Sequence, residues 1–129
     1  MNRQITLAIA GFGDRGSTYA SMQALFPDRM KVVAVADLDP EKVERARIQY
    51  HIPKENCFSS AEALFEREQL ADAAIVATMD RQHVAHGTLA LQKGYHLLLE
   101  KPISPDLVEC NRLLNMQTDR YVVVCHVLR

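Results

Sequence analysis

Short apolar runs alternate along this chain with stretches in which apolar residues recur at helical spacing. The runs are compact and partly β-branched, which is typical of strands buried on both faces of a parallel sheet. They predict strands at residues 5–10, 32–36, 56–58, 73–77, 95–99 and 121–127, and the stretches between them predict helices at residues 17–26, 40–50, 60–66, 81–93 and 105–116. Single helices between successive strands require crossover connections. We therefore predict an α/β fold, a doubly wound parallel sheet of about six strands with flanking helices.

Residues at the predicted helix ends support this division. Asp39 followed by Pro40 is typical of an N-cap with proline at the first helical position. Ser59, with Glu62 three residues later, predicts a capping box. Gly94 closes the fourth helix, because glycine tolerates the left-handed conformation of a helix C-terminus.

Length and charge limit the function classes. The chain has 129 residues, which is enough for one ordinary domain and too few for two, so we assign residues 1–129 to a single domain. The formal net charge is −1 with no basic run, which argues against nucleic acid as a partner. No apolar segment approaches the roughly 20 residues that span a bilayer. Three cysteines without C-x-x-C spacing favour reduced thiols and a cytoplasmic location.

The first strand leads into a glycine motif. Three of the five glycines are Gly11, Gly13 and Gly16, in the order G-x-G-x-x-G. The first allows a tight turn, the second lets a pyrophosphate approach the backbone, and the third lets helix and strand pack closely. Phe12 and Arg15 lie within the motif, and Arg15 could add a phosphate contact. The motif predicts a dinucleotide site, although a glycine turn without a ligand is the alternative.

An acidic residue follows at the distance that a ribose would require. Asp37 comes 21 residues after Gly16, at the end of the second predicted strand, where a carboxylate can accept both ribose hydroxyls. The same carboxylate would repel a 2′-phosphate, and Leu38 follows in place of an arginine. The sequence thus favours NAD over NADP as cofactor. The competing interpretation is a solvated loop aspartate.

The end of the fifth predicted strand carries Glu100-Lys101-Pro102. Carboxyl ends of parallel strands share one edge of a sheet, so Lys101 lies at the same edge as the glycine motif. A partly desolvated lysine can have its pKa lowered and exchange a proton with an alcohol, although a plain surface lysine is the alternative. His83 and His86 lie one helical turn apart, but no third ligand accompanies them, so we predict no metal site.

Other nucleotide-binding classes fit less well. Methyltransferases that use S-adenosylmethionine usually carry an acid just before the glycines, where this chain has Ala8-Ile9-Ala10. Short-chain dehydrogenases need a Tyr-x-x-x-Lys pair, which is absent. Flavoproteins share the glycine motif but do not need Glu-Lys-Pro. A nicotinamide-dependent oxidoreductase is the interpretation that uses the glycine motif, Asp37 and Glu-Lys-Pro together.

Taken together, these residues resemble the N-terminal domain of the Gfo/Idh/MocA oxidoreductase family, a Rossmann-type NAD(P)-binding domain. The similar positions are 11–16, 36–37, 77–78, 83, 90–91, 93–96 and 100–102. One departure is Thr78-Met79-Asp80, where the family often has Thr-Pro-Asn. The resemblance implies that Thr78 and His83 border the cofactor and that Glu100 and Lys101 line the nicotinamide pocket. It also implies that Lys101 binds the substrate hydroxyl and takes part in proton transfer.

The resemblance further implies a dehydrogenase that transfers hydride between NAD(P) and a sugar, inositol or similar polyol. Members of the family carry a C-terminal substrate domain, which is absent from this chain, so we expect these residues alone to bind cofactor without turnover. The full-length protein would be a homo-oligomer. A non-catalytic NAD-binding sensor or regulatory module is the alternative, because it needs the glycines and Asp37 but not Lys101.

Overall fold

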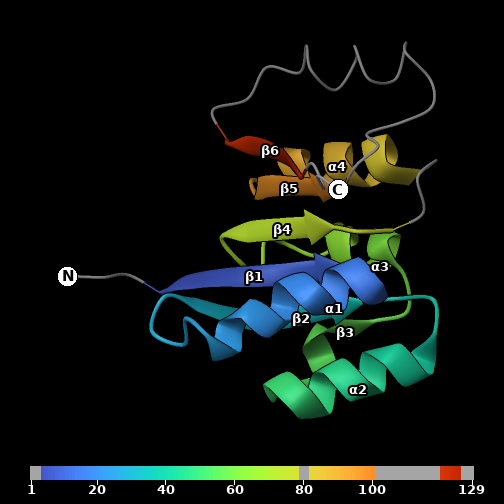
Figure 1. The fold of residues 1–129 in the computed structure, drawn as a ribbon. Coiled ribbons are helices and arrows are strands. Elements are labelled where there is room, and N and C mark those ends of the chain that lie inside the picture. Colours follow the sequence, from blue (N-terminus) through green and yellow to red (C-terminus); the bar gives the residue numbers. More distant parts are fainter. Residues whose placement is uncertain (1–3, 79–81, 101–119, 126–129) are drawn as a thin grey trace.

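The computed structural model describes residues 4–78, 82–100 and 120–125, and Figure 1 shows their arrangement. Six parallel strands form one sheet in the order β3-β2-β1-β4-β5-β6. The strands are β1 (Ile5–Ala10), β2 (Met30–Ala36), β3 (Cys57–Phe58), β4 (Ala73–Val76), β5 (His96–Glu100) and β6 (Val122–Cys125). Between them lie α1 (Asp14–Ser21), η1 (Met22–Ala24), α2 (Pro40–Tyr50), η2 (Lys54–Asn56), α3 (Ala61–Glu66) and α4 (His83–Gln92). The predicted doubly wound parallel sheet is confirmed.

Several predicted element ends need correction. The first helix begins at Asp14, three residues before the predicted start, because Gly13 serves as its N-cap. The predicted capping box at Ser59 is wrong: Ser60 caps α3 and accepts a hydrogen bond from the Ala63 amide. The helix predicted at residues 105–116 lies outside the described residues.

Other predicted ends are confirmed. The side chain of Asp39 caps α2 by accepting a hydrogen bond from the Glu41 amide, and Pro40 is the first residue of that helix. Gly94 has a φ of +100°, the left-handed conformation expected after α4. Local capping chemistry therefore fixes these two helix ends as the sequence indicated.

The two faces of the sheet differ in side-chain size. Successive residues of a strand point to opposite faces, so Ile9 on β1 and Val35 on β2 face α1 and α2. Ala8 and Ala10 on β1, with the corresponding small residues of β2 and β4, face α3 and α4. Because of this alternation, α1 and α2 lie on one face of the sheet and α3 and α4 on the other, as Figure 1 shows. Small side chains let α3 and α4 approach the sheet closely beside the site described below.

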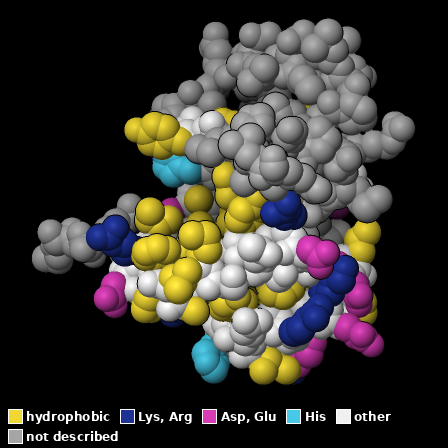
Figure 2. Space-filling model, in the orientation of Figure 1, with side chains coloured by type: hydrophobic (Ala, Val, Ile, Leu, Met, Phe, Trp, Pro, Cys, Tyr) yellow, Lys and Arg dark blue, Asp and Glu magenta, His cyan; other side chains and the backbone are white. Residues whose placement is uncertain are grey.

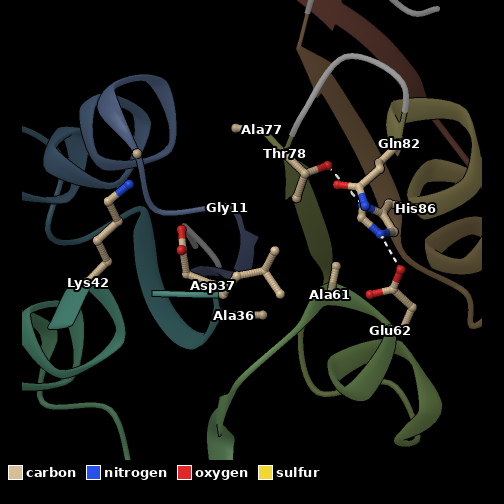
Figure 3. A pocket seen from close by; sticks show the side chains of 12 residues that line it. Gly11, Ala36, Asp37, Lys42, Ala61, Glu62, Ala77, Thr78, Gln82 and His86 are labelled. Carbon is tan, nitrogen blue, oxygen red and sulfur yellow. Dashed lines mark hydrogen bonds and ion pairs between the residues drawn. The ribbon is translucent and has the colours of Figure 1, made fainter. Parts of the chain in front are cut away.

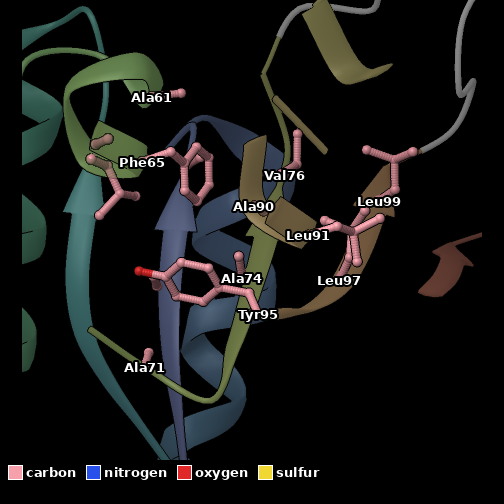
Figure 4. Packing of buried hydrophobic residues seen from close by; sticks show 14 of the residues in the cluster. Ala61, Phe65, Ala71, Ala74, Val76, Ala90, Leu91, Tyr95, Leu97 and Leu99 are labelled. Atoms are coloured by element: carbon pink, nitrogen blue, oxygen red, sulfur yellow. The ribbon is translucent and has the colours of Figure 1, made fainter. Parts of the chain in front are cut away.

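Tyr95 anchors the core beneath α3 and α4. Its side chain is fully buried, and its hydroxyl oxygen accepts a hydrogen bond from the Leu70 amide at 3.0 Å. The ring meets Phe65 edge to face with centroids 5.6 Å apart. Figure 4 shows the two rings next to each other in the core. Burial raises the pKa of the Tyr95 hydroxyl, which therefore stays protonated and polar within this core.

The surface is mixed in character. On the face shown in Figure 2, basic and acidic side chains lie next to one another over α2, and hydrophobic side chains gather beside the N-terminal end of β1. Large hydrophobic residues that are exposed near this end include Ile5, Leu25 and Phe26. Among the helices in the described part of the chain, none is long and apolar enough to cross a membrane.

Candidate functional site

The glycine turn joins β1 to α1 at the carboxyl edge of the sheet. Gly11 has a φ of +94°, and a Cβ there would lie 2.5 Å from the Ala77 carbonyl oxygen. A Cβ on Gly16 would overlap the Gly11 carbonyl oxygen. These two glycines are therefore required by the chain itself, because the turn, α1 and the end of β4 approach too closely for any side chain.

Gly13 is different. Its φ is −84°, which any residue adopts, and the nearest atom that an added Cβ would meet is the Lys42 ammonium nitrogen, 4.0 Å away. The fold alone would accept a side chain at this position. Gly13 is also the N-cap of α1, where backbone N–H groups of the first turn point outward and favour an anion. The space in front of Gly13 thus suits a phosphate group that must approach the backbone.

Asp37 lies at the end of β2, beside this turn. Its Oδ2 accepts a hydrogen bond from the Phe12 amide at 2.7 Å, and its Oδ1 accepts one from the Asp39 amide at 2.8 Å. Asp37 is therefore not a loosely solvated loop residue, which was the competing interpretation. A carboxylate has about four acceptor positions, so each oxygen retains the capacity to accept from a hydroxyl. The backbone holds Asp37 in place and leaves its acceptor function usable.

A pocket of about 620 Å³ opens between these elements, within the range of small-molecule and cofactor sites. Figure 3 shows Lys42 on one side of it, Asp37 near the middle, and Thr78 and His86 on the other side. Leu38 is 75 % exposed and offers an apolar surface. The described residues that line the pocket are Gly11, Gly13, Ala36, Asp37, Leu38, Lys42, Ala61, Glu62, Ala77, Thr78, Gln82 and His86.

The wall opposite Asp37 is a chain of three side chains. His86, on α4, is only 2 % exposed and is the one buried polar or charged residue in the described part of the structure. Its Nδ1 lies 2.8 Å from the Thr78 hydroxyl oxygen at the end of β4, and its Nε2 lies 2.9 Å from Glu62 Oε2 on α3. The hydrogen bond to His86 holds the pKa of the Glu62 carboxyl below its ordinary value. Glu62 is thus a carboxylate at neutral pH.

The structure places the predicted cofactor residues unevenly. Gly11, Gly13, Asp37 and Thr78 line the pocket, and Gly16 supports it from behind. Phe12 points its ring into the core against Tyr50, so only its backbone faces Asp37. Arg15 is exposed on the first turn of α1 and does not line the pocket. The side chains of His83 and Glu100, and all of Lys101, lie outside the described residues, so their roles stay predictions.

Four polar residues that line the pocket, Lys42, Glu62, Gln82 and His86, are not predicted as site residues by the sequence. Lys42 follows the N-cap of α2 by three residues, which places it at the carboxyl edge of the sheet, and this spacing could have indicated it. Glu62, Gln82 and His86 gave no such signal. The local pattern predicts a capping-box role for Glu62, and the spacing of His83 and His86 suggests only a metal ligand. Among the described residues, no group of three or more His, Cys, Asp or Glu side chains could hold a metal ion.

A known protein family matches almost the whole chain. The family model described as "Oxidoreductase family, NAD-binding Rossmann fold", that of Gfo/Idh/MocA, matches residues 5–127. The chain belongs to this family. The resemblance inferred from the sequence is therefore confirmed, and the domain is an NAD-binding Rossmann domain.

Individual relatives agree with this assignment. The chain is 32 % identical to inositol 2-dehydrogenase 4 of Saccharopolyspora erythraea over 106 residues, which cover 81 % of the chain and 30 % of that protein. It is 28 % identical to UDP-N-acetylglucosamine 3-dehydrogenase of Acidithiobacillus ferrooxidans over 123 residues, 94 % of the chain and 36 % of that protein. The chain thus spans about a third of the length of the curated relatives it matches.

A solved structure shows the same fold. The WlbA dehydrogenase from Chromobacterium violaceum, in complex with NADH and UDP-GlcNAcA, superposes with a TM-score of 0.86 at 19 % identity. The match covers 97 % of this chain and 36 % of that chain. The relatives named here are dehydrogenases, and the comparisons give no support to a non-catalytic sensor.

Proposed function

We propose that this domain binds NAD in the pocket described above and serves a dehydrogenase that acts on a CH–OH group of a sugar or polyol. The observation that carries the proposal is the contrast among the glycines. Gly11 and Gly16 are explained by contacts within the chain, whereas Gly13 is not, and an approaching pyrophosphate explains it. The residues present therefore fit a dinucleotide.

Each part of the ligand has a partner in the pocket. The pyrophosphate would lie on the N-terminus of α1 above Gly13, with the Lys42 ammonium beside it. The adenosine ribose would donate its hydroxyls to the two oxygens of Asp37 that the backbone already orients. Leu38 would pack against the flat base. This arrangement follows the general rule that ligands of doubly wound sheets bind at the carboxyl ends of the strands.

The choice of NAD over NADP rests on charge. A 2′-phosphate on the ribose would meet the Asp37 carboxylate, and this repulsion opposes binding. Lys42 partly offsets it, but its ammonium lies toward Gly13, where the pyrophosphate already supplies negative charge. We expect at least tenfold tighter binding of NAD, since like charges in a partly dehydrated site are costly.

The chemical step is assigned to Lys101. When bound, the nicotinamide supplies the hydride acceptor. The ε-amino group of Lys101 would accept the proton of the substrate hydroxyl as the carbinol carbon loses its hydride, and it would return the proton in the reverse direction. The names of the relatives, which act on inositol and on a UDP-sugar, support this class of substrate. Assembly into a homo-oligomer and a cytoplasmic location stay predictions from the sequence.

Two experiments test the proposal. Calorimetric titration of the 129-residue chain with NAD and with NADP measures binding and preference; equal or tighter binding of NADP would contradict the assignment of Asp37. For the reaction, a protein with the further residues that the relatives possess is needed. In that protein Lys101→Ala should lower kcat about a hundredfold or more, the usual effect of losing a general acid–base group. Wild-type turnover in this variant would remove Lys101 from the mechanism.

A further inference from the structure

The start of β6 is attached to β5 through a side chain as well as through the backbone. β6 is the last strand in the sheet order, and among the described strands it pairs with β5 alone. The Leu97 amide donates a hydrogen bond to the Tyr121 carbonyl oxygen at 2.8 Å, and the Tyr121 amide donates one to His96 Nδ1 at 3.0 Å. An imidazole nitrogen therefore supplies the acceptor at the point where the strand begins.

The donor in this hydrogen bond fixes the state of the ring. A backbone N–H can only donate, so His96 Nδ1 must offer a lone pair, and the ring is neutral with its proton on Nε2. The imidazole also lies against the Tyr121 ring, with centroids 5.3 Å apart and the planes inclined by 31°. Tyr121 is 76 % exposed and His96 is half-buried, so solvent protons reach this contact.

His96 is surrounded by few other groups that carry charge. In the described elements next to it, the charged or titratable side chains are those of Asp72 before β4, Lys93 at the C-cap of α4, and Arg120 and Tyr121 before β6. Imidazole is the side chain that ordinarily changes its charge between about pH 5 and pH 8. The attachment of β6 therefore responds to pH in this range through His96.

We propose that His96 is a proton-sensitive latch for the start of β6. The neutral ring accepts from the Tyr121 amide, but once Nδ1 takes up a proton from solvent, two donors face each other and this hydrogen bond is lost. A protonated imidazole would still attract the Tyr121 ring, yet that attraction gives the amide no acceptor. The latch lies at the amino edge of the sheet, opposite the cofactor pocket, and does not depend on the proposed function.

Hydrogen exchange of the Tyr121 amide in the 129-residue chain tests the latch by NMR, after correction for the intrinsic exchange rate at each pH. We expect its protection to be about fivefold lower at about pH 5 than at about pH 7.5, the scale for losing one hydrogen bond. The Gly11 amide, which donates to the Ala36 carbonyl oxygen, is the internal reference and should keep its protection. ¹⁵N spectra of the His96 ring should show a proton on Nε2 alone at the higher pH and on both nitrogens at the lower.

His96→Asn is the informative variant, because its side-chain oxygen can accept from the Tyr121 amide and does not titrate. Protection of that amide should then be the same at both pH values. His51→Asn is the matched control: His51 is an exposed histidine at the C-cap of α2, in a left-handed conformation that asparagine tolerates, so the response of Tyr121 should equal that of wild type. Wild-type protection that does not change with pH, or a fall that persists in His96→Asn, would overturn the latch.

Discussion

The two walls of the pocket hold their polar side chains in different ways. On one wall the backbone positions Asp37, through the amides of Phe12 and Asp39. On the other wall side chains position one another, with His86 between Glu62 and Thr78. The first arrangement follows from a glycine turn and a strand end. The second depends on three elements meeting at one ring. The difference teaches that the backbone of the fold itself positions Asp37, whereas the position of Glu62 depends on how α3 and α4 pack around His86.

Gly16→Ala should have the largest effect, because it breaks the backbone that supports the first wall. The added Cβ would overlap the Gly11 carbonyl oxygen, and neither backbone segment can move without opening the turn. We expect a loss of about 3 kcal/mol or more in the free energy of unfolding, as for other severe steric changes in a core. Urea denaturation measures it. A loss below about 1 kcal/mol would show that the turn is not so closely packed.

Gly13→Ala adds the same methyl group within the same glycine motif, but at a position where the fold leaves room for it. The Cβ meets no atom nearer than the Lys42 ammonium nitrogen at 4.0 Å, so the free energy of unfolding should change by about 1 kcal/mol or less, the scale for an N-cap substitution. NAD affinity should fall tenfold or more, about 1.4 kcal/mol, because the methyl group occupies the approach of the pyrophosphate. Calorimetric titration beside urea denaturation distinguishes the two effects. Unchanged affinity would remove Gly13 from the site.

Asp37→Asn tests whether the first wall is built by the backbone. Both carboxylate oxygens accept from amides, so one of them must be replaced by an NH₂ group that faces an N–H donor. We expect a loss of about 1–3 kcal/mol in unfolding free energy, the cost of an unsatisfied buried donor. NAD affinity should fall as well. Asp28→Asn, at an exposed position, is the control and should change neither quantity. If Asp37→Asn leaves stability unchanged, the backbone bonds to Asp37 contribute little.

The same contrast explains how much the sequence predicted. The parallel strands, the cap at Asp39 and the conformation of Gly94 depend on local chemistry, and they were predicted correctly. Asp37 was found because a fixed spacing from the glycines marks it. The second wall was not found, because Glu62 and His86 are 24 residues apart and their pairing depends on how α3 and α4 pack. The capping-box prediction at Ser59 failed for a local reason: α3 begins one residue later, with Ser60 as its N-cap.

The smallest expected effect concerns the second wall in acid. The hydrogen bond between Glu62 and His86 lowers the pKa of the Glu62 carboxyl in the folded state. The ionised carboxylate therefore stabilises the fold at pH values above 4.5, the ordinary carboxyl pKa. This stability is lost as pH falls below that value. Because Glu62 is mostly exposed, we expect only about 0.5 kcal/mol. The difference in unfolding free energy between wild type and Glu62→Gln should therefore be larger at pH 6.5 than at pH 3.5. An equal difference at both values would show that the ionic form contributes nothing.

The central claim is that a single dinucleotide lies between the two walls. Backbone amide chemical shifts of the 129-residue chain, recorded by NMR during titration with NAD, test it most directly. The account predicts that the largest shift changes occur on both walls: at Gly13, Asp37 and Leu38 on the first, and at Glu62, Thr78 and His86 on the second. Shift changes confined to the glycine turn and Asp37, with the second wall unaffected at saturation, would contradict it.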